Sequence, residues 1–360
     1  MPAQSNLALK KIINHVVKSG ASRLHLEAGS KPVLRVDQKL VILENEQVVE
    51  KDFLDEISNI ILSKEKLAEL TAKRRAMSTY TFEGNIRFKV HVYYQKDNLS
   101  YVFTYIPSVI SDPASIGLTQ ELIDQLGNKN GLMIIAGYHS SGKTTTVLSL
   151  LNHINNTQSK YILTIEKPIE YIITPAKSII EQREVGRDTN SFSAALEFCK
   201  DSDVDVIFLS QISDYATLEN TFDLVSSGRF VITVIEADSA ADAVAKLIEL
   251  APDSEADKTR HALAELLAGV VVQQLVPRRG GGQITVTEIL IPNSASASLI
   301  KEGRYSQITS VIQTSRAEGM RSLDQALLEL VKTDEVNYKD ALEIAVDKIN
   351  FKNATQKFKR

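Results

Sequence analysis

The sequence of 360 residues contains a single cysteine, Cys199. One thiol can form no disulfide within the chain and cannot build a four-cysteine zinc site, and this composition suits a reducing cytosol. The sequence also lacks any run of about 18 uninterrupted apolar residues, the length that a membrane-spanning helix needs. Its first twenty residues contain no apolar signal core. From these absences we expect a cytoplasmic protein that is peripheral to any membrane and reaches it through partners.

The sequence has little excess charge of either sign. It contains 41 Lys and Arg against 45 Asp and Glu, a formal net charge of −4. With this balance the protein has no excess of positive charge that would attract nucleic acid non-specifically. The segment "RFKVHVYY" alternates basic and aromatic residues in the way that is typical of a two-faced strand. We therefore expect no nucleic-acid partner.

The length and composition predict two globular domains, because 360 residues exceed a single hydrophobic core. Residues 1–107 combine helical runs with short strands and three longer extended segments, which predicts a small α+β domain with a largely antiparallel sheet. Residues 108–114, "SVISDPA", are expected to form a linker. Residues 115–360 alternate strands with helices, the pattern of a parallel sheet.

A phosphate-binding motif follows the first strand of the second domain. After the apolar run "GLMIIA" comes "GYHSSGKTTT", in which Gly137, Gly142, Lys143 and Thr144 match G-x-x-x-x-G-K-[ST]. The glycines allow a sharp turn and a close approach of backbone to phosphate. The exposed N–H groups and the helix that follows together form an anion cradle.

The motif predicts binding of ATP with Mg²⁺. Lys143 is expected to reach the β- and γ-phosphates, and the Thr144 hydroxyl is expected to bind Mg²⁺. The predicted nucleotide-binding residues are Gly137, Ser140, Ser141, Gly142, Lys143, Thr144 and Thr145. The interior of the motif contains no further glycine, so Tyr138 and His139 could pack on a nucleotide or crowd it. A chance match and a vestigial, empty loop are the alternatives.

At this point the chain resembles a known family. The strand and phosphate loop are followed in order by "ILTIEKPIEY", "IIEQREVGRDTNSFSAAL", "DVIFLSQISD" and "GMRSLDQALLEL". This series is similar to the PilT/PilU branch of the type IV pilus retraction ATPases, in the secretion-ATPase superfamily. The resemblance implies a RecA-like P-loop ATPase domain behind a smaller, PAS-like N-terminal domain. It also implies a homohexamer, or co-assembly with an active retraction ATPase, docked on an inner-membrane pilus platform protein.

Two acidic motifs of the family depart from its pattern. The family's T-I-E-D-P-I-E reads T-I-E-K-P-I-E here, so Glu166 and Glu170 are kept while Lys167 takes the place of an aspartate. Lys167 could stabilise a bound nucleotide or lie solvated at the surface. The family ends a later strand with Gly-Glu, and that glutamate carries hydrolysis. Here the strand "VIFL" ends with Ser210 and Gln211.

Two further motifs depart from the family as well. The T-L-H-T box aligns with "VIEA", which puts Glu236 in the position of a histidine. The family's N-terminal domain supplies arginines in trans to the phosphates of a neighbouring subunit. Arg87 matches one of them, Lys89 replaces a second and Thr104 replaces a third.

These departures predict a protein that binds ATP and hydrolyses it poorly. An amide can orient a water molecule but is a very poor base, and loss of a positioned base costs about 10²–10⁴ in rate. The main hypothesis is an accessory or regulatory subunit in pilus retraction and twitching motility. An active retraction ATPase, with Glu166 or Glu170 in the catalytic role, is one alternative. A nucleotide-independent assembly adaptor is the other.

Overall fold

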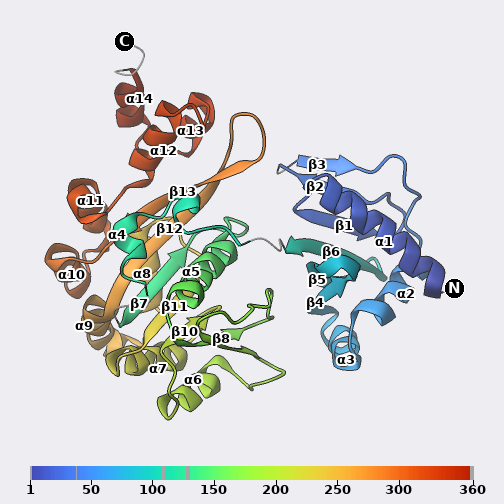
Figure 1. The fold of residues 1–360 in the computed structure, drawn as a ribbon, viewed down its shortest axis with the longest axis horizontal. Helices are drawn as coiled ribbons and strands as arrows, with labels where there is room; N and C mark the ends of the chain where they lie inside the picture. The colour runs from blue at the N-terminus through green and yellow to red at the C-terminus, as the bar shows by residue number, and fades with distance from the viewer. Residues whose placement is uncertain (1, 38, 107–109, 127–129, 357–360) are drawn as a thin grey trace. The chain divides into compact units, whose positions relative to one another are not determined.

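The computed structural model describes residues 2–37, 39–106, 110–126 and 130–356. It divides into two compact units, which Figure 1 shows in blue and in green to red. The first unit comprises residues 1–109 and 168–171, and the second comprises residues 110–167 and 172–360. Of the predicted linker 108–114, residues 108 and 109 lie outside the described residues, and residues 110–114 group with the second unit.

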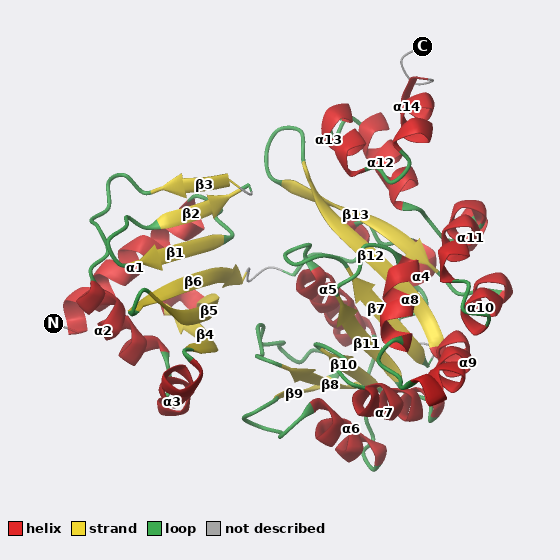
Figure 2. Ribbon diagram, turned by 180° about the vertical axis from the view of Figure 1, so that it is seen from behind, coloured by secondary structure: helices red, strands yellow, loops and turns green. Residues whose placement is uncertain are grey.

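The first unit is an antiparallel sheet covered on one face by helices (Figure 2). Its strand order is β3-β2-β1-β6-β5-β4. The elements are α1 (Pro2–Lys18), β1 (Arg23–Glu27), β2 (Val33–Val36), β3 (Lys39–Ile42), α2 (Lys51–Ile61), α3 (Lys64–Lys73), β4 (Arg75–Phe82), β5 (Ile86–Gln95) and β6 (Asn98–Ile106). This arrangement agrees with the predicted small α+β domain.

The core of the first unit forms where alternate residues of the strands meet the helices. Phe88, Tyr101 and Phe103 are fully buried, and the Tyr101 hydroxyl donates a hydrogen bond to the Leu54 carbonyl oxygen of α2 at 2.9 Å. Because side chains alternate along a strand, the residues between these ones lie on the opposite, open face of the sheet. Arg87, Lys89 and Thr104 are therefore on that open face.

The second unit contains a seven-stranded sheet of order β13-β12-β7-β11-β10-β8-β9. Among the described strands of this second sheet, only β13 pairs antiparallel, on β12. The strands are β7 (Gly131–Ala136), β8 (Tyr161–Glu166), β9 (Ile179–Glu184), β10 (Val206–Leu209), β11 (Phe230–Ile235), β12 (Leu267–Pro277) and β13 (Gln283–Leu290). The predicted parallel sheet is confirmed, with an antiparallel strand at one edge.

Helices cover both faces of this sheet, so its central strands are buried runs (Figure 1). The helices are α4 (Gln120–Ile123), α5 (Lys143–Thr157), α6 (Phe192–Lys200), α7 (Tyr215–Ser226), α8 (Ala240–Ile248), α9 (Ala256–Leu266), α10 (Ser294–Lys301), α11 (Ile308–Thr314), α12 (Leu323–Lys332), α13 (Tyr338–Ile344) and α14 (Lys348–Gln356). One apolar core joins the strands to α6 through α11. Helix α5 packs on the other face, where it buries Val147, Leu151 and Ile154. The C-terminal helices α12 to α14 bury Leu327 and Phe351 against Val276 and Val286 of the β12–β13 hairpin.

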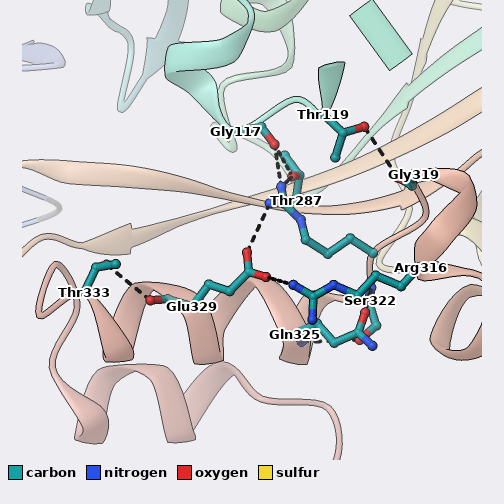
Figure 3. A network of polar contacts seen from close by, with 10 residues as sticks. Gly117, Thr119, Thr287, Arg316, Gly319, Ser322, Gln325, Glu329 and Thr333 are labelled. Carbon is teal, nitrogen blue, oxygen red and sulfur yellow. Dashed lines mark hydrogen bonds and ion pairs between the residues drawn. The ribbon is translucent and has the colours of Figure 1, made fainter. Parts of the chain in front are cut away.

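A polar network fastens α12 to the start of the second unit (Figure 3). Arg321 donates hydrogen bonds to the Gly117 carbonyl oxygen and, at 2.6 Å, to Thr287 Oγ1. Its guanidinium lies 3.6 Å from a carboxylate oxygen of Glu329, whose other oxygen accepts a hydrogen bond from Arg316 at 2.7 Å. Burial lowers the pKa of Arg321, and the Glu329 carboxylate opposes that effect. The network therefore joins three segments that are distant in the sequence.

None of the helices in the described part of the chain is both long enough and apolar enough to span a lipid bilayer.

Candidate functional site

The phosphate loop lies between β7 and α5, at the carboxyl edge of the parallel sheet. Gly137 and Gly142 both have positive φ, 147° and 91°. A Cβ on Gly137 would lie 2.4 Å from Ser141 Oγ and 2.5 Å from the Gln273 carbonyl oxygen, and a Cβ on Gly142 would lie 3.0 Å from Gln273 Nε2. At position 137 only glycine fits without a shift of the backbone, and this explains why the motif has glycine there.

Lys143 is the first residue of α5 and its side chain turns back over the loop. Its Nζ donates hydrogen bonds to the carbonyl oxygens of Gly137 at 2.7 Å and Tyr138 at 2.6 Å. Burial lowers the pKa of Lys143, while the negative charge of Glu236 acts in the opposite direction. A phosphate oxygen is a stronger acceptor than a carbonyl, so Lys143 is placed to exchange these bonds for charge-assisted ones.

The remaining loop residues differ in exposure. Ser141 is buried, whereas Ser140 is exposed and adopts a φ of 64°. Tyr138 is 58% exposed and its hydroxyl lies 3.4 Å from Asp238 Oδ2. Tyr138 and His139 are both exposed on the loop, and their packing on or crowding of a nucleotide stays a prediction. Thr144 and Thr145 follow in the first turn of α5 and are partly exposed.

Three other strands end at the same edge of the sheet. Beside β7 lie β11, β10 and β8 in that order, all parallel, so the residues that follow them share the edge with the loop. Glu236 follows β11, Gln211 follows β10 and Glu166 ends β8. The structure therefore brings together four segments that are separated by up to 100 residues.

Of these residues, the two carboxylates have contrasting environments. Glu166 is 6% exposed, and its Oε1 accepts hydrogen bonds from Thr164 Oγ1 at 2.7 Å and from Gln182 Nε2 at 3.2 Å. Glu236 is exposed, and its charge acts on Lys143 at the start of α5. Lys167, directly after Glu166, is exposed.

The strand β10, which Ser210 and Gln211 follow, is buried along its whole length. Val206 to Leu209 are all buried, and the Ser210 N–H continues the parallel ladder by donating to the Ile165 carbonyl oxygen at 3.0 Å. Gln211 is exposed at the end of the strand. Its amide can orient a water molecule at the carboxyl edge, but it has no basic oxygen that could accept a proton.

The predicted trans-acting residues lie on the open face of the first unit. Arg87 Nη2 donates hydrogen bonds at 3.1 Å to Thr79 Oγ1 and to the Ile169 carbonyl oxygen. Lys89 Nζ lies 2.6 Å from Glu170 Oε1. Ile169 and Glu170 belong to the short segment that groups with this unit. Glu170, a candidate catalytic carboxylate, is thus the ionic partner of Lys89.

The sheet register adds an observation about Thr104. This residue is paired with Arg23 of β1 on one side and with Lys89 of β5 on the other. Directly opposed residues have Cβ atoms about 4.5–5.5 Å apart and point to the same face. Thr104 is therefore a neutral residue between two cations.

Sequence reasoning missed two buried polar residues near the loop. Gln273 is 1% exposed, and its Nε2 donates a hydrogen bond to the Ser141 carbonyl oxygen at 2.7 Å. Glu288 is buried and accepts a hydrogen bond from the Ala240 N–H at 2.8 Å. The sequence offers one signal for such residues, which is a polar residue inside an apolar strand. Gln273 in "VVVQQLV" is an example.

The described residues contain no cluster of three His, Cys, Asp or Glu side chains that could hold a metal ion by itself. A Mg²⁺ ion does not need one, since it is commonly held by one or two protein oxygens and by the phosphates of the nucleotide. The Thr144 hydroxyl, at the start of α5, fits that role.

Comparisons with known proteins agree with this geometry. A family model described as "Type II/IV secretion system protein" matches residues 114–342. The chain is 31% identical over 345 residues to "Type IV pilus retractation ATPase PilT" of Pseudomonas aeruginosa, which covers 95% of this chain and 99% of that protein. It is 26% identical over 337 residues to "Type IV pilus ATPase PilU" of the same organism, with coverage of 93% and 88%. The solved structure "Crystal Structure of the Pilus Retraction Motor PilT and Bound ADP" matches with a TM-score of 0.82 and 30% identity, over 95% of this chain and 98% of that one.

Proposed function

Because the chain belongs to the type II/IV secretion system protein family, we propose that it is an ATP-binding subunit of the machinery that retracts type IV pili. Its part in retraction is accessory or regulatory, and its hydrolysis of ATP is slow or absent. The observation that carries the proposal is the loop between β7 and α5, where a Cβ at Gly137 would meet atoms at 2.4 and 2.5 Å. The resemblance to PilT and PilU predicted from the motifs is confirmed, whereas the accessory role is the proposal.

Binding of the triphosphate is supported by the groups that converge on the loop. The loop and the first turn of α5 present backbone N–H groups, and the N-terminus of a helix favours negative charge. Lys143 exchanges its bonds to Gly137 and Tyr138 for bonds to phosphate oxygens. The Thr144 hydroxyl would hold Mg²⁺, and the ion would supply positive charge against the phosphates.

Slow hydrolysis is supported by the residues at the ends of β10 and β11. Gln211 can orient the attacking water but cannot take its proton. Glu236 adds a negative charge close enough to act on Lys143, where the transferring phosphoryl group calls for a neutral or cationic group. Both features lower the rate of hydrolysis while they leave the anion cradle intact.

The proposed assembly is a homohexamer or a joint ring with an active retraction ATPase. In this assembly Arg87 and Lys89 serve the nucleotide of a neighbouring subunit, after release from Ile169 and Glu170. The ring docks on a pilus platform protein and so lies at the cytoplasmic side of the inner membrane. The PilT and PilU relatives support this proposal by their association with type IV pili.

An active retraction ATPase is the second candidate, and one observation favours it. Glu166 is a buried carboxylate at the end of β8, on the same edge as the loop. A carboxylate in this position could act as the base in place of Gln211.

Two measurements on the purified protein test the proposal. Mg-ATP should raise the melting temperature, because a ligand that binds only the folded state stabilises it by about 2.7 kcal/mol at a hundred times its Kd. Steady-state hydrolysis of ATP should be close to background. Gln211→Glu alone should recover little activity, and Gln211→Glu combined with Glu236→His should recover more, because the parts of one site act as a unit.

Lys143→Ala is the control for both measurements, and it should abolish the thermal shift. Robust hydrolysis by the wild type that disappears in Lys143→Ala would favour the active ATPase. Absence of any shift at millimolar Mg-ATP would favour an adaptor that works without nucleotide.

A further inference from the structure

Gln273 lies in β12, directly beneath the phosphate loop. β12 runs parallel to β7, and Val272 is paired with Ala136, the residue before Gly137. Gln273 therefore follows the paired segment at the point where the loop leaves the sheet. Its Nε2 donates a hydrogen bond of 2.7 Å to the carbonyl oxygen of Ser141, 132 residues away in the sequence.

This hydrogen bond determines how one peptide group of the loop is oriented. The Ser141 carbonyl and the Gly142 N–H belong to the same planar trans peptide, so they point in opposite directions. With the carbonyl held on Gln273, the Gly142 N–H points away from β12. In the G-x-x-x-x-G-K-[ST] loop, this side is the one on which phosphate is bound.

The same peptide would be easy to invert without Gln273. A peptide flip changes ψ of the preceding residue and φ of the following one, and glycine accepts either sign of φ at little cost. Gly142 has a φ of 91°. Gly142, which the motif leads us to expect close to phosphate, is therefore also a residue whose own conformation constrains its N–H little.

The surroundings of Gln273 indicate that it does not serve stability alone. Its Oε1 and the nearby Ser141 Oγ are buried atoms without a hydrogen-bond partner among the described residues. Leaving the Gln273 Oε1 unsatisfied is unfavourable, so the hydrogen bond from Nε2 to Ser141 must offset a cost within the same side chain. The amide orientation is also defined, because Oε1 in place of Nε2 would face the Ser141 carbonyl oxygen.

We propose that Gln273 is a positioning residue for nucleotide binding, which holds the Ser141–Gly142 peptide with its N–H directed at the phosphates. This inference rests on the proposed nucleotide binding and adds a residue that lies outside the loop motif. Gln273 itself does not contact the nucleotide. It acts through the backbone of Ser141, and its loss lets the loop adopt an orientation that binds anions less well.

The test compares Gln273→Met with Gln274→Met in the full chain. Gln274 is the adjacent residue of the same type, and its side chain points to the opposite face of β12. Binding of Mg-ADP is measured by isothermal titration calorimetry, and the melting temperature is measured without nucleotide. Gln273→Met should raise the Kd about tenfold, the equivalent of one lost hydrogen bond. Gln274→Met should change it less than about twofold.

The two readouts separate positioning from simple stability. Positioning predicts a higher Kd whether or not the melting temperature falls, whereas a purely structural role predicts a lower melting temperature with an unchanged Kd. Gln273→Asn, whose amide is one methylene too short to reach Ser141, should weaken binding in the same way and serves if the methionine variant does not fold.

The outcome also distinguishes this inference from the proposed function. If the wild type binds Mg-ADP and both Gln273 variants bind it equally well, the positioning role is overturned and nucleotide binding stands. If the wild type binds no Mg-ADP, nucleotide binding and the inference are both overturned.

Discussion

The carboxylate of Glu288 accepts a hydrogen bond from the backbone N–H of Ala240, 2.8 Å away, and so joins β13 to the first turn of α8. α8 begins at Ala240, four residues after Glu236, the carboxylate that acts on Lys143. The buried carboxylate of Glu288 therefore holds the N-terminus of the helix that follows the segment beside the phosphate loop.

Glu288→Gln should change how stability depends on pH. Burial raises the pKa of Glu288, the charges of Asp238 and Asp324 add to this effect, and the bonds from Ala240 and Leu323 oppose it. A raised pKa in the folded state contributes stability that is present below the ordinary value and is lost as pH rises through the raised value. Glutamine stays neutral and keeps an acceptor for Ala240. The unfolding free energy of the wild type minus that of Glu288→Gln should therefore fall from pH 4 to pH 7.

Urea unfolding at several pH values measures this difference. Glu265→Gln is the control, because Glu265 is exposed and pairs only at the surface with Lys301. A difference for Glu288→Gln that does not vary with pH would contradict the prediction.

Ser140→Gly should stabilise the protein. Ser140 has a φ of 64°, a region that disfavours side chains with a Cβ by about 1–2 kcal/mol. Glycine removes this strain but gains entropy in the unfolded chain, so we expect a net gain of about 0.5–1 kcal/mol in unfolding free energy. Ser213 is an exposed loop residue that does not have a positive φ, so Ser213→Gly should give no gain in unfolding free energy. Chemical denaturation measures the unfolding free energy of both variants. An equal decrease in the two variants would refute the prediction for Ser140→Gly.

Arg321→Met should destabilise the protein more than Arg316→Met. Arg321 satisfies the Gly117 carbonyl and Thr287 Oγ1, whereas Arg316 is a 70% exposed side chain whose ion pair with Glu329 lies at the surface (Figure 3). Loss of buried hydrogen bonds costs roughly 1–3 kcal/mol, and an exposed ion pair contributes less than about 1 kcal/mol. Urea unfolding measures the stability of the two variants. The midpoint concentrations give the order when the slope of unfolding free energy against urea concentration is unchanged. Similar midpoints for the two variants would show that the network is not stabilising.

Thr104→Arg should lower stability, even though the resemblance to the family leads us to expect an arginine at this position. The new cation would lie between Arg23 and Lys89, its direct partners in the sheet. Like charges opposite one another cost up to about 1 kcal/mol, and salt screens this cost. Thr104→Val is the neutral control. Melting temperatures at low and high salt provide the measurement, and an arginine variant as stable as the valine variant at low salt would exclude the effect.

Several features of the site could be predicted because each lies in one short stretch of sequence. The loop from Gly137 to Thr144 is a local motif, and the strand before it and the helix after it have clear apolar patterns. The buried run "VIFL" likewise predicts β10 and, with the resemblance, the position of Gln211 at its end. Glu166 and Glu236 are predicted as site residues from the motifs of the family that the chain resembles, and their catalytic roles stay predictions.

The sequence by itself determined the two-part organisation, the parallel sheet and the phosphate loop, because periodicity and glycine positions act over a few residues. Only the tertiary structure decided that Gln273 holds the Ser141 carbonyl, that Glu288 joins β13 to α8, and that Thr104 lies between Arg23 and Lys89. Each of these relationships depends on strand order and register. A shift of one residue in register would turn every one of these side chains to the other face of its sheet, and no local pattern in the sequence records that register.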